Sequence, residues 1–180
     1  MKHAFAVALI LSCAGFVCAQ SGKYTITEVK HAAPVAAAPR ECLNTFRAFF
    51  SYLQYSKPDI VADEQAQKRW LSQLLRKGLA ERLKTFTNPA ESPDYPSNNS
   101  FIGAWDPPTT YSIVSSRRYG KTAVIDVLYK WGPKTNYPGD ERITFFSFVL
   151  EDGGWKLDDV YTFRGEYVQA ESLNQYLLSK

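Results

Sequence analysis

The last third of the sequence alternates apolar and polar residues in four consecutive runs, and this pattern constrains the fold more than any other feature. The runs span residues 111–118, 122–131, 142–150 and 155–163, and glycine-containing turns or loops separate them. A period of two is typical of β-strands, and short turns join neighbouring antiparallel strands. The sequence therefore predicts an antiparallel meander of four strands.

The alternation also assigns side chains to the two faces of the predicted sheet. In the second run, Asp126 shares a face with Val124 and Leu128, while Tyr129 lies on the opposite face. In the fourth run, the residues on the face of Asp159 are Trp155, Leu157, Tyr161 and Phe163. Asp159 is therefore expected among apolar neighbours, where desolvation raises the pKa of a carboxyl group.

Two stretches before the strands carry helical periodicity. In residues 41–56, apolar side chains recur every three or four positions and form one stripe. The second stretch spans residues 63–86, with Asp63 as the expected N-cap and a break expected at Ser72 or Gly78. These helices are expected to cover the sheet.

The segment between the helices and the strands, residues 87–108, is rich in proline and is predicted to be an irregular surface crossing. Phe101, Ile102 and Trp105 are too apolar for free solvent and are expected to pack onto the domain or to cover a cavity. A final helix or turn is predicted at residues 172–178.

Residues 1–19, MKHAFAVALILSCAGFVCA, have the layout of a secretory signal peptide, with a basic start, an apolar run and small residues before Gln20. We expect the protein to be exported, and therefore periplasmic or secreted. In the alternative interpretation, residues 10–13 act as a bacterial lipobox and Cys13 is acylated, which would make the product a lipoprotein.

The remaining chain divides into a linker and one domain. Residues 20–40 are rich in alanine and proline, a composition typical of a semi-rigid spacer, and His31 lies within it. Residues 41–180 are enough for a single domain with its own core.

Composition excludes several classes of function. After removal of the leader, Cys42 is the only cysteine left and His31 is the only histidine left. The mature chain therefore has too few of these residues for a disulfide framework, a Cys/His metal site or a Cys–His nucleophile pair. The net charge of +3 is too small to indicate nucleic-acid binding. No mature stretch has the apolar length of a transmembrane helix, and no motif indicates a metal or a cofactor.

The order of elements carries a resemblance to a known superfamily. Helices precede the predicted sheet, and the closing hairpin, residues 153–161, reads GGWKLDDVY. Over residues 41–165 the chain resembles the cone-shaped superfamily of ketosteroid isomerase, scytalone dehydratase and nuclear transport factor two, most of all its exported bacterial members of no assigned function. The resemblance implies an α+β fold in which N-terminal helices pack on a curved, cone-like antiparallel sheet of four or more strands. It also implies a pocket, but not its ligand.

An enzyme of this shape would need an inward carboxylate and an inward phenol. The candidate catalytic residues are Asp159, Asp126 and Tyr129. In the alternative interpretation, Asp159 is structural and is held by Arg164, by Arg117 or by backbone groups.

Three functions follow from these observations. The sequence favours a non-catalytic envelope domain that binds a small apolar ligand or has a structural role, with Trp105, Phe146, Phe148 and Tyr161 as candidate ligand-binding residues. The second is an interaction domain that forms a homodimer, or binds an envelope protein, through the sheet face. The third is an isomerase or dehydratase that uses a pocket aspartate.

Overall fold

The computed structural model describes residues 36–55, 59–87, 92, 95–104, 107–136, 138–164 and 169–178, and every structural statement below refers to these residues. They belong to one compact unit, Val35–Lys180. The predicted leader, most of the predicted linker and Trp105 lie outside the described residues.

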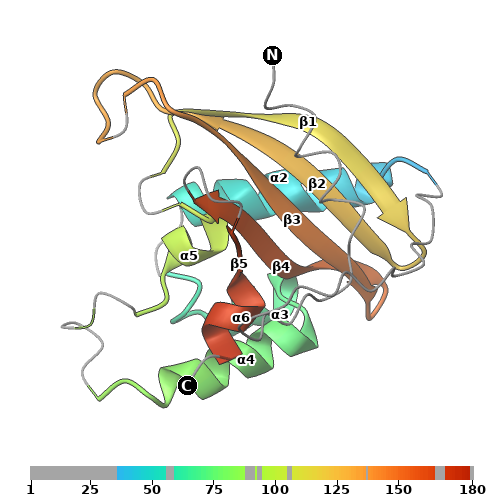
Figure 1. The fold of residues 1–180 in the computed structure, drawn as a ribbon. Coiled ribbons are helices and arrows are strands. Elements are labelled where there is room, and N and C mark those ends of the chain that lie inside the picture. The colour runs from blue at the N-terminus through green and yellow to red at the C-terminus, as the bar shows by residue number, and fades with distance from the viewer. Residues whose placement is uncertain are drawn as a thin grey trace, which may run out of the picture. The chain divides into compact units, whose positions relative to one another are not determined.

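The described chain has an α+β fold built on a five-stranded antiparallel sheet (Figure 1). The strands, which neighbour one another in chain order, are β1 (Thr110–Tyr119), β2 (Thr122–Lys130), β3 (Glu141–Glu151), β4 (Gly154–Arg164) and β5 (Gln169–Ser172). The four predicted strands are confirmed to within one residue at each end. The prediction omitted β5, because its sequence, QAES, has no apolar alternation.

The two helical stretches are also confirmed, as α2 (Arg40–Tyr55), α3 (Glu64–Trp70) and α4 (Gln73–Leu83). The N-cap of α3 is Asp63, whose carboxylate accepts a hydrogen bond from the Ala66 amide at 2.9 Å. The break falls at Leu71 and Ser72, because the Ser72 amide donates to the Leu157 carbonyl of β4 at 2.7 Å. Ser72 then caps α4 by accepting from the Leu75 amide at 3.1 Å.

The prediction that residues 87–108 contain no element is wrong at α5 (Asn98–Ile102). Ser97 and Ser100 form a capping box at its start, and Gly103 ends it with a φ of 74°. As expected, Phe101 and Ile102 are buried. The final helix is confirmed as α6 (Leu173–Leu178).

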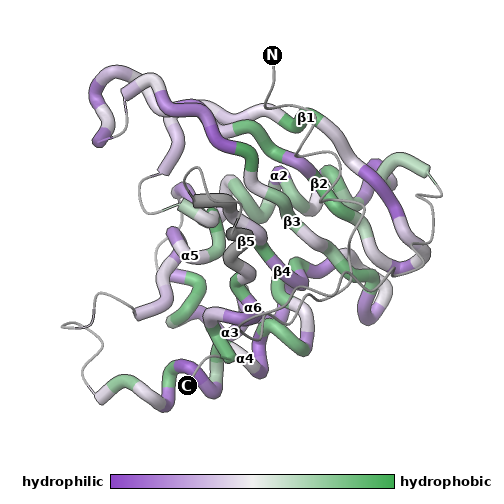
Figure 2. Tube along the Cα trace, in the orientation of Figure 1, coloured by the Kyte–Doolittle hydropathy of each residue, from purple (hydrophilic) through white to green (hydrophobic). Residues whose placement is uncertain are grey.

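Helix α2 runs across one face of the sheet, while α3, α4 and α6 lie beside β4 (Figure 1). We call the face under α2 the helix face, and its buried side chains on β2 and β3 are Ala123, Ile125, Val127, Tyr129, Thr144, Phe146 and Phe148. We call the opposite face the far face, and its side chains include Val124, Asp126, Leu128, Phe145 and Ser147. Hydrophobic stretches run along β2 and β3, whereas the loop between them is hydrophilic (Figure 2).

A β-bulge in β4 overturns the face predicted for Asp159. Leu157 pairs with Phe148, but Asp159 pairs with the next residue of β3, Ser147, so Asp158 is an extra residue in the ladder. Trp155 and Leu157 remain in the main core, whereas Asp159 shares the far face with Ser147 and Tyr161. Strict alternation, on which the prediction relied, fails at this point.

Gly103 gives a test of how α5 docks on the sheet. A Cβ atom at this position would lie 2.6 Å from Thr162 Cγ2 and 3.0 Å from Val160 Cγ1, in addition to the cost of the positive φ. We expect Gly103→Ala to lower the free energy of unfolding in urea by about 3 kcal/mol.

Gly120→Ala is the matched control, because its φ is also positive, at 60°, but nothing lies within 4 Å of the added Cβ. It should cost only the backbone term, about 1–2 kcal/mol. Equal losses in the two variants would contradict the close packing of Gly103 against β3 and β4.

Candidate functional site

Aromatic rings fill the space between α2 and the helix face. The Phe46 ring lies 5.1 Å from the ring of Phe146 and 6.0 Å from that of Tyr111, measured between centroids. The Phe50 ring lies 4.3 Å from that of Tyr111 and 5.9 Å from that of Tyr129. Phe46, Phe50, Tyr129 and Phe146 have no exposed surface, so this space is part of the hydrophobic core.

Two candidate ligand-binding residues, Phe146 and Phe148, belong to this core and are fully buried. The third, Tyr161, is half-buried and lies on the far face, where it makes a hydrogen bond with Asp159. The fourth, Trp105, lies outside the described residues. The structure therefore does not bring the described candidates together around one cavity.

The candidate phenol, Tyr129, is fully buried on the helix face. Its hydroxyl donates a hydrogen bond of 2.8 Å to the backbone carbonyl oxygen of Ile102, at the end of α5. Burial raises the pKa of this phenol well above its usual range, so the hydroxyl keeps its proton. The hydrogen bond ties β2 to α5 and satisfies a buried polar group at each end.

The candidate carboxylate, Asp159, connects β4 to the start of α6. Its Oδ2 accepts a hydrogen bond from the Ser172 hydroxyl at 2.6 Å. Its Oδ1 accepts from the backbone amides of Asn174, at 3.0 Å, and Val160, at 2.8 Å. The Ser172 hydroxyl in turn accepts from the Gln175 amide at 3.2 Å, as an N-cap does. These contacts attach the C-terminal segment to the sheet.

Desolvation by burial raises the pKa of Asp159, as the sequence predicted. The hydrogen bonds from Ser172, Asn174, Val160 and Tyr161 act in the opposite direction, because they stabilise the ionised carboxylate. Burial and the charge of Asp159 also raise the pKa of Tyr161. Similar shifts occur in structural networks and in active sites, so they do not by themselves indicate chemistry.

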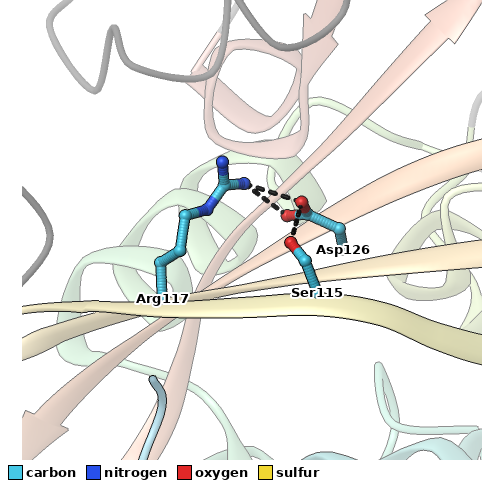
Figure 3. A network of polar contacts seen from close by, with 3 residues as sticks. All are labelled: Ser115, Arg117 and Asp126. Atoms are coloured by element: carbon cyan, nitrogen blue, oxygen red, sulfur yellow. Dashed lines mark hydrogen bonds and ion pairs between the residues drawn. The ribbon is translucent and has the colours of Figure 1, made fainter. Parts of the chain in front are cut away.

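The second candidate carboxylate, Asp126, lies in a polar network on the far face (Figure 3). Nη2 of Arg117 lies 2.7 Å from each of its two oxygens, and the Ser115 hydroxyl donates to Oδ2. Ser115 is directly opposite Asp126 in the register of β1 and β2. The Arg117 side chain is 25% exposed and that of Asp126 only 9%, so the pair is largely desolvated.

Of the partners expected for a structural Asp159, the backbone groups are confirmed by the Val160 and Asn174 amides. Arg117 as a partner of Asp159 is wrong, since Arg117 pairs with Asp126. The correct pairing was available from the sequence. The tight turn at Gly120 pairs Tyr119 with Thr122, and counting back along the hairpin places Ser115 opposite Asp126 and Arg117 on the same face. The roles of Ser172 and Asn174 had no such local signal.

The three catalytic candidates do not converge. Tyr129 lies on the helix face, and the two aspartates lie on the far face. Asp126 is opposite Phe145 and Asp159 is opposite Ser147, so strand spacing separates the two residues by about 12 Å. No reacting atom could contact both carboxylates and the Tyr129 hydroxyl at once.

A hollow of about 340 Å³ lies elsewhere, where the N-terminus of α2 meets the ends of β1, β3 and β4. Its lining consists of Pro39, Glu41, Thr45, Arg118, Leu150, Gly153, Gly154 and Trp155 and includes no candidate site residue. Within the part of the chain that the structure describes, no three His, Cys, Asp or Glu side chains gather as metal ligands would. The same residues include no helix with the length and apolarity to span a membrane.

Comparisons with protein-family models, curated proteins and solved structures found no match to this chain.

The pKa of Asp159 leads to a prediction about stability. Because its pKa in the folded protein is above the ordinary value of 3.8, the folded state holds the proton more tightly than the unfolded state. The stability contributed by Asp159 is therefore complete below pH 3.8 and falls as the pH rises through the folded-state pKa. Asp159→Asn is similar in shape and does not titrate.

The quantity to compare is the free energy of unfolding of the wild type minus that of Asp159→Asn, measured by urea denaturation. We expect this difference to decrease as the pH is raised from below 4 towards neutrality. Other carboxyl groups are common to both proteins and cancel in the difference. A difference that is independent of pH, or that increases with pH, would contradict the raised pKa.

Proposed function

We propose that residues 41–180 form a non-catalytic domain of an exported protein, and that the domain acts by associating with another protein molecule. In this proposal residues 1–19 direct export and residues 20–40 separate the domain from the envelope surface. We further propose that the domain is a cone-like member of the superfamily of ketosteroid isomerase and nuclear transport factor two. The α+β order of elements and the antiparallel sheet under α2 support this assignment.

The observation that carries the proposal is the aromatic packing between α2 and the helix face. A domain that holds a small apolar ligand needs a concave site of at least about 300 Å³ lined by apolar side chains. Here the rings of Phe46, Phe50 and Phe146 contact one another in the space where such a site would lie. This packing argues against a ligand cavity beneath α2 and for a structural or association role.

The hydrogen bonds of the candidate catalytic residues support the same conclusion. The Tyr129 hydroxyl, the Asp159 carboxylate and the Asp126 carboxylate all make hydrogen bonds within the chain. A general acid or base needs a free position towards its substrate. In this domain each group instead bonds a buried or part-buried partner within the chain, which is the behaviour of a structural polar network.

Native mass spectrometry of residues 20–180, purified from the exported form, tests this proposal. We expect the mass of a protein complex, with no small molecule retained beneath α2, because the described side chains there already fill the space. The mass of the polypeptide alone would contradict the association.

The matched variant is Phe146→Ala, which opens space beneath α2 and should create a binding site for small apolar probes such as benzene. Stoichiometric retention of a small molecule by the wild type, lost in Phe146→Ala, would contradict the proposal.

A further inference from the structure

β1 is an edge strand, since it begins the strand order of the sheet. Among the described residues, one contact covers the outer side of β1. This contact is the antiparallel bridge between Ala36 and Arg118, which lies near the C-terminal end of the strand. From Thr110 to Ser116 the strand contains no charged residue, proline or glycine. Thr110 and Ser112 are exposed, and Val114 is 50% exposed. Edge strands of this composition are open to pairing with another strand.

The backbone groups that point outward follow from the register. The Arg118 amide donates outward, to the Ala36 carbonyl at 2.8 Å, so alternation directs the backbone groups of Ser116 outward as well. A bulge at Val114 shifts this alternation between Ile113 and Ser115. Before the bulge, the outward residues are therefore Tyr111 and Ile113, on either side of Ser112.

We propose that residues 110–114 of β1 pair antiparallel with the same residues of a second copy of this chain, about a two-fold axis at Ser112. Tyr111 of each copy exchanges backbone hydrogen bonds with Ile113 of the other, and the two Ser112 residues lie directly opposite each other. The inference rests on the proposed association function and names its partner and surface.

Three observations favour a second copy as the occupant. The outward residues Tyr111 and Ile113 are placed symmetrically about Ser112, as a two-fold pairing requires. The paired stretch is uncharged, so self-pairing places no like charges opposite each other. Arg117 and Arg118 lie beyond it and already contact Asp126 and the Trp155 ring, so they do not require an acidic partner.

Charged substitutions at Ser112 test the pairing directly. We expect mature wild-type protein to dimerise in analytical ultracentrifugation. Ser112→Lys and Ser112→Glu should each weaken the dimer about tenfold, because like charges would then meet at the axis. An equimolar mixture of the two variants should recover the dimer, since opposite charges would meet.

Ser51→Lys and Ser51→Glu are the matched controls, since Ser51 is exposed on α2, and they should dimerise as the wild type does. Ser112→Cys should also form a disulfide-linked dimer on mild oxidation, whereas Ser116→Cys should not, because Ser116 is not opposite itself in this register.

Two results would overturn the inference. If the wild type dimerises and both Ser112 charge variants dimerise equally well, the association function stands but uses another surface. If the wild type is monomeric at the highest soluble concentration, the second copy is not the partner, and the association function is then judged by the complexes found in native mass spectrometry.

Discussion

The contact on which the rest of this structure depends is the packing of Phe46 and Phe50 of α2 against the aromatic side chains of the sheet. The ring of Phe46 packs against the rings of four other residues, Phe50, Tyr111, Phe146 and Phe148. Burial of each such phenylalanine contributes roughly 1.5–3 kcal/mol, and offset ring pairs add to this. Because this cluster fills the helix face, polar side chains that could take part in chemistry lie on the far face and at the sheet edges.

The carboxylates on the far face serve as connections between elements. Asp159 attaches the C-terminal segment to β4 through Ser172 and Asn174. Asp126 connects β2 to β1 through Arg117 and Ser115. Removing one partner of such a group leaves the other buried and unsatisfied, which is more costly than the net strength of the contact. Both aspartates were candidates for catalysis because the sequence pattern placed them among apolar residues. In the structure both are buried and hydrogen-bonded, which makes them effective structural contacts.

Most of the fold could be predicted from the sequence because periodicity is a local property. The helices α2, α3 and α4 and the first four strands follow from the spacing of apolar residues, and the Asp63 N-cap follows from capping chemistry. The bulge at Asp158 could not be predicted, because it is a property of how β3 and β4 pair and not of β4 alone. It reversed the face of Asp159 and with it the site built on that face. By contrast, Ser97 and Ser100 have the spacing of a capping box, so the start of α5 is a local property of the sequence.

The most direct test of the account is the stability of Phe46→Ala, measured by chemical denaturation beside Tyr55→Ala. Phe46 is fully buried at the centre of the aromatic cluster, whereas Tyr55, on the same helix, is 81% exposed. The account predicts a loss of about 3–5 kcal/mol for Phe46→Ala and almost none for Tyr55→Ala. A loss below about 1 kcal/mol for Phe46→Ala would mean that the space beneath α2 is not the close-packed core on which the proposed function rests.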